Sequence, residues 1–272
     1  MPWTPGRRRA QRALEAPYED VPGHLLQPLW DWITGGFLGI SGYHADRLRE
    51  IAIDLRMPLS AGSYSDQTRV YLNRCNDEPD FMLDVVEAML ERYGWDDGRA
   101  LALNDLLRAA NSAYTVKGSR DGLELRVAAG VKELVQEAVD AAGGSAGDHL
   151  ADAWNEAYGR NHDAVKSYSE SIKAVEAALA PHVSPQNPKQ TLGTMIRDVA
   201  AKPSKWEFEI ADGHVSNVET MLNMMRTLWD GQTSRHGGVT PTRPESIEAA
   251  RAAVHLGATL VQWGVSGTFR VR

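Results

Sequence analysis

The clearest helical pattern in the chain lies in residues 163–181, DAVKSYSESIKAVEAALAP. Its apolar side chains recur every three or four residues, which is the period of one face of an α-helix. Asp163 is a typical N-cap residue, and Pro181 cannot continue a helix. The pattern therefore predicts a long amphipathic helix whose buried stripe is formed by Val165, Tyr168, Ile172, Val175 and Leu179.

Further helical patterns surround this one in the second half of the chain. They are joined by short connections and cover residues 149–158, 191–200, 216–229 and 244–263. Helices joined in this way favour an antiparallel bundle. We therefore expect a helical domain over residues 148–272, and the glycine-rich segment 143–147 is predicted to be the linker that precedes it.

The first half of the chain is predicted to be mostly helical as well. Apolar residues recur at helical spacing in residues 25–33, 44–55, 65–73, 78–93, 100–111 and 131–142. Only residues 113–117 and 123–127 alternate, on either side of the segment 118–122, and this alternation predicts a small β-hairpin. The expected fold class is mostly α: a helical N-terminal domain with one hairpin, residues 16–142, followed by a helical bundle.

Charge and apolar content narrow the class of protein. The 272 residues contain 29 Lys and Arg against 36 Asp and Glu, a net charge of −7, which argues against a bulk nucleic-acid binder. No apolar stretch is long enough to span a bilayer, so we expect no membrane partner. Cys75 is the single cysteine; it cannot form an internal disulfide, indicates a cytoplasmic location and is expected to be a buried structural thiol.

Residues 1–15 differ from the rest of the chain. They contain four arginines, and no apolar run follows them, so they do not resemble a signal peptide. We expect a mobile basic arm that is either a solvated tail or a contact for nucleic acid.

The densest polar cluster lies between two helical patterns, in residues 229–238, WDGQTSRHGG. A guanidinium can hold a phosphate bidentately, and an imidazole can exchange a proton near neutral pH. Arg235 and His236 together suit the cleavage of a phosphodiester without a metal: His236 would transfer a proton at the 2′-hydroxyl or at the leaving oxygen, and Arg235 would stabilise the charge on the phosphate. An ordinary polar turn fits the same spacing.

This loop also resembles a known family. Together with the helix AARAAVHLGATLV at residues 249–261 and the helix at residues 167–179, it is similar to the abortive-infection (Abi) C-terminal domains of the HEPN superfamily. The likeness covers residues 148–272. It implies a four- to five-helix up-and-down bundle that is usually dimeric and occurs in metal-independent RNA-cleaving toxins and phage-defence proteins.

The resemblance also suggests site residues. The mark of the superfamily is an Arg, a few polar residues and then a His at the start of a helix, and His236 matches that His. Arg226 precedes His236 by ten positions and Arg235 by one. We favour Arg235 because it lies in the same turn, with Gln232 as a polar partner, and Arg226 is the alternative.

The sequence therefore predicts a cytoplasmic, metal-independent endoribonuclease of the toxin or antiphage (abortive infection) type. It would need no cofactor and no metal, would bind RNA and form a homodimer, and would respond to an antitoxin or a phage trigger; the N-terminal domain would recognise the trigger or the RNA. The alternative is a non-catalytic HEPN-like protein that dimerises or binds a nucleotide or RNA. A structural phage component is a third class that composition does not separate from these.

Other polar residues are weaker candidates. Glu170, Lys173 and Glu176 lie off the apolar stripe of their helix, and a solvated ion pair is the favoured interpretation over a carboxylate facing the Arg-His turn. His255 is expected to be a packed core histidine. A modest basic patch that could track a nucleic-acid backbone beside Trp206 is formed by Lys189, Arg197, Lys202 and Lys205.

Overall fold

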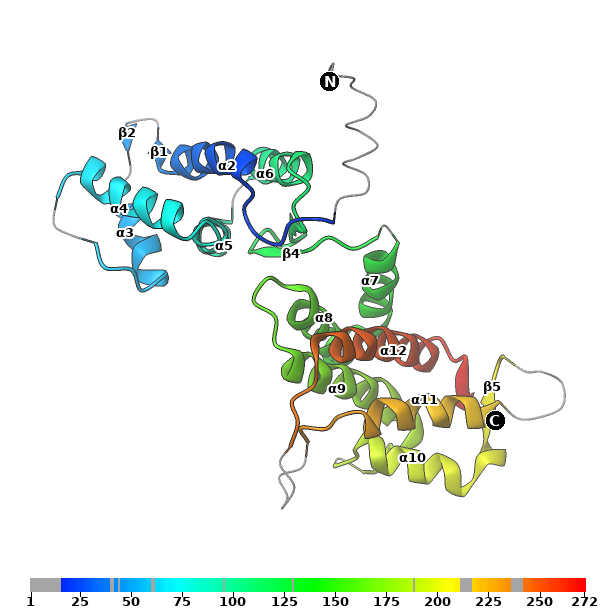
Figure 1. Ribbon diagram of the computed structural model, residues 1–272. Helices are drawn as coiled ribbons and strands as arrows, with labels where there is room; N and C mark the ends of the chain where they lie inside the picture. Colours follow the sequence, from blue (N-terminus) through cyan, green and yellow to red (C-terminus); the bar gives the residue numbers. More distant parts are fainter. Residues whose placement is uncertain are drawn as a thin grey trace, which may run out of the picture. The chain divides into compact units, whose positions relative to one another are not determined.

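The computed structural model describes residues 16–39, 42–43, 45–59, 62–94, 96–128, 130–187, 189–210, 217–235 and 242–272. Within these residues the protein is mostly helical, which confirms the expected fold class (Figure 1). The chain divides into two compact units, Met1–Arg126 and Val127–Arg272. The predicted basic arm, residues 1–15, lies outside the described residues.

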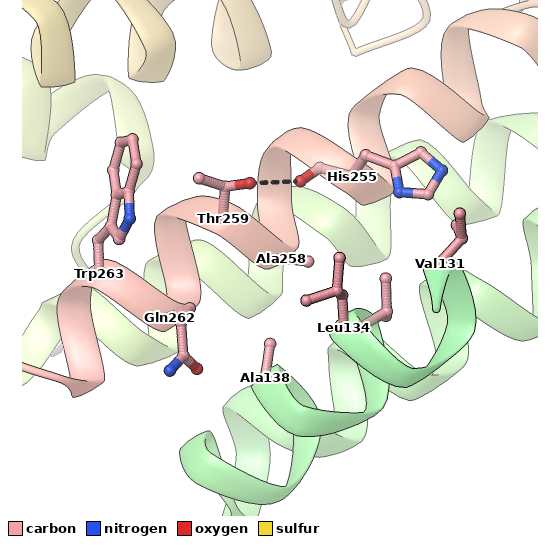
Figure 2. A pocket seen from close by; sticks show the side chains of 9 residues that line it. Val131, Leu134, Ala138, His255, Ala258, Thr259, Gln262 and Trp263 are labelled. Atoms are coloured by element: carbon pink, nitrogen blue, oxygen red, sulfur yellow. Dashed lines mark hydrogen bonds between the residues drawn. The ribbon is translucent and has the colours of Figure 1, made fainter. Parts of the chain in front are cut away.

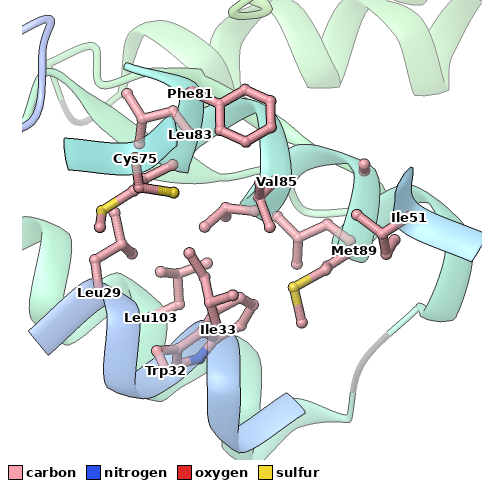
Figure 3. Packing of buried hydrophobic residues seen from close by; sticks show 14 of the residues in the cluster. Leu29, Trp32, Ile33, Ile51, Cys75, Phe81, Leu83, Val85, Met89 and Leu103 are labelled. Carbon is pink, nitrogen blue, oxygen red and sulfur yellow. The ribbon is translucent and has the colours of Figure 1, made fainter. Parts of the chain in front are cut away.

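The first unit is built around helix α5 (Phe81–Tyr93). Helices α2 (Gly23–Gly36), α3 (Ala45–Asp54) and α4 (Tyr64–Asp77) all contact it. Figure 3 shows how side chains from these helices meet around α5 to form an apolar core. The predicted stop is confirmed, because Gly94 follows α5 with a φ of 48° and donates its N–H to the carbonyl oxygen of Leu90.

Cys75 of α4 lies in this core and is completely buried. Burial raises the pKa of its thiol to about 12, so the reactive thiolate is not formed near neutral pH. The expectation of a buried structural thiol is confirmed.

The predicted hairpin is also present in the first unit. It follows helix α6 (Asp97–Ala109) and consists of β3 (Tyr114–Val116) and β4 (Leu123–Leu125). The two strands are antiparallel, with Val116 opposite Leu123. Another short antiparallel pair, which the sequence did not predict, joins β1 (Leu38–Gly39) to β2 (Gly42–Tyr43).

The second unit is organised around helix α9 (Ala164–Val183). Helices α8 (Gly144–Tyr158) and α12 (Ile247–Val265) pack along it. A Cβ added at Gly257 of α12 would lie 3.3 Å from the carbonyl oxygen of Ser171, so α9 and α12 approach closely there. The predicted N-cap is confirmed: the Asp163 carboxylate accepts a hydrogen bond from the backbone N–H of Lys166 at 2.9 Å.

Further helices and one pair of short strands complete the second unit. Helix α7 (Val131–Ala142) contacts α8 and α12, and α10 (Leu192–Ala201) contacts α9 and α11 (Val218–Asp230). A 3₁₀ turn, Pro203–Lys205, leads into strand β5 (Trp206–Phe208). This strand pairs antiparallel with β6 (Phe269–Val271). No helix in the described part of the chain is both long and apolar enough to cross a membrane.

Three details of the sequence prediction are corrected. Residues 143–147 are not a linker, because α8 begins at Gly144 and Ala146 and Gly147 are buried in it. The division between the two units follows Arg126 rather than this segment, because α7 packs against α8 and α12. Pro181 does not stop α9, which continues to Val183, because a proline near a helix end removes only one hydrogen bond.

Candidate functional site

The polar loop that follows α11 is fixed at its start by Arg235. The guanidinium carbon of Arg235 lies 3.4 Å from the centroid of the Trp229 ring, and Nη1 donates a hydrogen bond to the backbone oxygen of Trp229 at 2.8 Å. A guanidinium above an indole face is a favourable cation–π contact. Both side chains are half-buried. The loop therefore folds back over the end of α11 and holds the arginine in one place.

Glu245 lies just before α12 and is hydrogen-bonded to the loop. Its Oε1 atom accepts a hydrogen bond from the backbone N–H of Ser234 at 2.8 Å, and Thr233 donates its hydroxyl to the carbonyl oxygen of Arg243 at 2.6 Å. Burial alone would raise the pKa of Glu245, but the hydrogen bonds from Ser234 outweigh it and lower the pKa below its usual value. The loop thus closes on a charged, buried carboxylate whose Oε2 atom has no hydrogen-bond partner in the described residues.

Helix α9 carries three charged residues spaced three positions apart: Glu170 is buried, Lys173 is exposed and Glu176 is half-buried. The Glu170 carboxylate lies 2.7 Å from Nζ of Lys173 and 2.6 Å from Nδ1 of His149 on α8. The ion pair is present, but Glu170 itself is only 8% exposed, so the expectation of a solvated pair is wrong. Burial alone would raise the pKa of Glu170; the hydrogen bonds from Lys173 and His149 lower it below its usual value.

Glu176 connects α9 to the start of α10. Its Oε1 atom accepts a hydrogen bond from the backbone N–H of Leu192 at 2.6 Å, at the start of α10. Burial raises the pKa of Glu176, while that hydrogen bond and the positive charges of Arg235, Lys173 and His149 act in the opposite direction. The charges of Arg235 and of Lys173 on α9 therefore act on the same carboxylate.

Direct packing completes the connection between α10 and the loop. A Cβ added at Gly193 would lie 2.6 Å from Cε2 of Trp229, so the indole lies directly against the backbone of the first turn of α10. Tyr168 of α9 donates its hydroxyl to the carbonyl oxygen of Leu228 at 3.1 Å. A series of contacts thus leads from Glu176 through the start of α10 and Trp229 to Arg235.

Arg226, Gln232 and His236 are the other predicted site residues. Arg226 lies about one turn before the end of α11. Its Nη1 atom donates a hydrogen bond to Glu219 at 2.7 Å and another to Asn223 at 2.9 Å. Arg226 is thus held by side chains of its own helix. Gln232 is half-buried after the end of α11. His236 falls in the segment 236–241, which is outside the described residues.

A separate pocket of about 490 Å³ lies between α7 and α12 (Figure 2). Its walls are mainly apolar, with His255, Thr259 and Gln262 as the polar side chains of α12. The His255 ring accepts or donates a hydrogen bond at Nε2 to the Tyr158 hydroxyl, 2.7 Å away. Burial lowers the pKa of His255 and so favours the neutral ring. The residue is half-buried at the wall of this pocket rather than in the core, where it was expected.

The predicted basic patch does not offer an aromatic ring for stacking. Trp206 is only 1% exposed and stacks on Phe269, with ring centroids 5.2 Å apart. Lys205 lies over the Trp206 ring at 5.2 Å. A base could not reach this indole without unpacking β5 from β6.

The geometry shows residues that the sequence interpretation did not single out for chemistry. Trp229 orients Arg235, Glu245 closes the loop, and His149 pairs with a buried Glu170. Among the described residues, no three or more His, Cys, Asp or Glu side chains are grouped so that they could hold a metal ion. Comparison with protein-family models, with curated proteins and with solved structures finds no match to this chain.

Proposed function

We propose that the second unit is a metal-independent endoribonuclease of the toxin or antiphage type, similar to HEPN domains. One observation carries the proposal: a half-buried guanidinium, Arg235, is fixed on an aromatic ring immediately before a histidine in the chain. A preorganised cation loses little entropy when it binds a phosphate, and it can stabilise the additional negative charge of a phosphorane.

The reaction follows from the chemistry of the two side chains. His236 removes the proton of a ribose 2′-hydroxyl, whose oxygen attacks the adjacent phosphorus. The 2′-oxygen–phosphorus bond forms, the bond to the 5′-oxygen breaks, and the 5′-oxygen takes up a proton. The products are a 2′,3′-cyclic phosphate and a 5′-hydroxyl. Arg235 neutralises the phosphate oxygens during this step, with Gln232 as a further hydrogen-bond donor to the phosphate.

Arg235 is favoured over Arg226 for the phosphate contact. Arg226 is engaged by Glu219 and Asn223 on its own helix, whereas Arg235 lies in the loop that contains the histidine. RNA, a second copy of the chain, and an antitoxin or a phage-derived trigger are the partners that this function implies. The first unit would then recognise the trigger or the RNA in the cytoplasm.

The test is cleavage of purified tRNA and rRNA by the full-length protein in the presence of EDTA. Wild type is expected to cleave, and His236→Ala should lower the rate by about 10²–10⁴-fold. Arg235→Ala should lower it by about 10²–10³-fold, while Arg226→Ala should leave it nearly unchanged. Circular dichroism melting of each variant checks that the loss is not due to unfolding. Equal cleavage by His236→Ala and wild type would refute the assignment.

A second function is favoured by the same contact. The hydrogen bond from Arg235 to the Trp229 backbone also suits an arginine that only shapes the loop for binding. The chain would then be a non-catalytic protein that dimerises or binds RNA or a nucleotide. It would bind labelled RNA in a filter-binding assay without cleaving it, and Arg235→Lys, which cannot form the bidentate contact, would bind as well as wild type.

A further inference from the structure

The pocket between α7 and α12 is not used by the reaction proposed above. Its volume of about 490 Å³ lies within the range of about 300–1,000 Å³ that is typical of small-molecule sites. Among the described residues that line it, none is Asp, Glu, Lys or Arg. A charged ligand would lose its hydration there without meeting an opposite charge, so the pocket favours an uncharged molecule.

The lining of the pocket follows one face of each helix. On α12 it extends from His255 to Trp263, and the rise of an α-helix places the Cα atoms of these two residues about 12 Å apart along the axis. Figure 2 shows their side chains at opposite ends of the row. Between them, Ala258 of α12 and Ala138 of α7 contribute only a methyl group each. The small side chains leave an elongated space between the two helices.

One polar atom of the lining lacks a hydrogen bond. Thr259 donates its hydroxyl to the carbonyl oxygen of His255 at 3.0 Å, and Nε2 of His255 lies 2.7 Å from the Tyr158 hydroxyl. Oε1 of Gln262 is buried and has no hydrogen-bond partner among the described residues. Figure 2 shows the Gln262 side chain extending from α12 to the side on which α7 lies. A ligand that donates an N–H or O–H to this oxygen would remove the cost of leaving it unpaired.

The rim of the pocket carries an exposed apolar side chain. Leu134 of α7 lines the pocket and is 68% exposed. An apolar ligand below it would remove part of this surface from water, which is favourable. Leu134 thus adds to the apolar surface that a ligand can contact.

We propose that the pocket between α7 and α12 is a binding site for an uncharged, elongated and mainly apolar small molecule that donates one hydrogen bond to Oε1 of Gln262. The apolar body of the ligand packs between Ala138 and Ala258, under Leu134. Binding at this site does not depend on the proposed RNA cleavage.

Two small molecules of nearly the same shape test the hydrogen bond. 2-Phenylindole is uncharged and elongated and carries one N–H, whereas 2-phenylbenzofuran has an oxygen at that position and cannot donate. Binding of each molecule to the full-length protein is measured by equilibrium dialysis. Wild type is expected to bind one 2-phenylindole with a dissociation constant of about 1–100 μM, and 2-phenylbenzofuran about tenfold more weakly.

Gln262→Leu removes the acceptor and keeps a side chain of similar size. The preference for 2-phenylindole should therefore fall from about tenfold to nearly none. Because both molecules are compared on the same variant, a general change in the pocket cancels from this ratio. An unchanged preference would refute the hydrogen bond to Gln262 and with it the proposed class of ligand.

Ala258→Leu fills the middle of the pocket and should weaken the binding of both molecules at least about tenfold. The matched control is Ala252→Leu, an exposed position of α12 outside the pocket, which should bind like wild type. Melting curves show whether Ala258→Leu is folded. If it is not, the ratio measured with Gln262→Leu decides.

The outcomes distinguish this site from other occupants of the same face. Absence of saturable binding of 2-phenylindole, or equal binding by wild type and folded Ala258→Leu, would refute the site. If sedimentation shows that Ala258→Leu changes the number of associated copies while neither molecule binds to wild type, the face is a contact between copies and the small-molecule site is refuted. RNA cleavage is measured separately, so the failure of one proposal leaves the other standing.

Discussion

Helices α5 and α9 are each enclosed by the other helices of their unit, but they bury different kinds of side chain. All of the buried residues of α5 are apolar: Phe81, Met82, Leu83, Val85, Val86, Ala88, Met89 and Leu90. The buried residues of α9 include Ser167, Glu170 and Ser171 beside its apolar stripe. The buried residues of α5 are thus all apolar, whereas α9 also buries a charged group.

Apolar and charged buried side chains contribute differently to the free energy of unfolding. Apolar burial contributes about 25 cal/mol for each Å² removed from water, whereas a buried carboxylate adds little net stability even when it is well paired. We infer that the apolar side chains of α5 stabilise the first unit. The buried Glu170 makes α9 contribute less to the stability of the second unit than a wholly apolar buried face would. Variants of the two helices should therefore differ in which property they change.

The largest effect on stability is expected from α5. Leu90 is completely buried, so Leu90→Ala should destabilise the first unit by about 2–5 kcal/mol through lost apolar contacts and the remaining cavity. Urea unfolding of the full-length protein, followed by circular dichroism, measures this. The matched control is Leu101→Ala on α6, whose leucine is 62% exposed and which should change stability little. A loss below about 1 kcal/mol for Leu90→Ala would contradict the role of α5.

The next effect comes from the buried carboxylate of α9. Glu170→Gln leaves Lys173 without its anionic partner and should destabilise the protein by about 1.5–3 kcal/mol at pH 7. Because the pKa of Glu170 is lowered in the folded protein, its contribution is present above the unfolded pKa and is lost as pH falls through the folded pKa. Urea unfolding should show a gap between wild type and variant that narrows toward acid; a gap independent of pH would argue against an ionised Glu170.

Gly193 tests the contact between α10 and the loop. In Gly193→Ala the new methyl group would lie 2.6 Å from the Trp229 ring, which must shift together with Arg235. Overpacking of this kind costs about 1–3 kcal/mol, and we expect RNA cleavage to fall as well. Gly23→Ala, where nothing lies within 4 Å of the new atom, is the control. Trp229 fluorescence and cleavage rates that do not change would mean that the indole position does not matter.

The smallest effect is expected for Glu176, and its sign is opposite to that of Glu170. Burial raises the pKa of Glu176, so its contribution is fully present below the unfolded pKa and is lost as pH rises through the folded pKa. Glu176→Gln, which can still accept the hydrogen bond from Leu192, should be slightly more stable than wild type at neutral pH and should lose this advantage in acid. Melting temperatures of wild type and variant between acid and neutral pH measure this. A variant that is less stable than wild type at pH 7 would contradict the view that burial disfavours the charged form of Glu176.

Much of the fold follows from local signals in the sequence. Asp163 and Gly94 mark helix ends because a side-chain acceptor or a left-handed backbone is needed there. The hairpin of β3 and β4 was predictable because its strands are separated by a short turn. The pairing of β5 with β6 joins segments about sixty residues apart, and three-residue strands carry too little alternation to be detected.

The candidate site was predictable only in part. The loop with Arg235 stood out because polar residues lie between two apolar patterns, but nothing local showed that Trp229 would hold the guanidinium. Glu170 looked solvated because only one stripe of α9 was counted. Small residues at 167, 171, 174 and 178 form a second packed face, and their spacing of three or four residues was the available signal that Glu170 lies beside a buried surface.

The most direct test of the proposed chemistry is the structure of the cleaved ends. An RNA and a DNA of the same sequence are incubated with the full-length protein in EDTA, and the products are analysed by mass spectrometry. We expect the RNA alone to be cut, with a 2′,3′-cyclic phosphate on one product and a 5′-hydroxyl on the other, because the nucleophile is the 2′-hydroxyl. Cleavage of the DNA, or RNA cleavage that requires an added divalent cation, would contradict the mechanism.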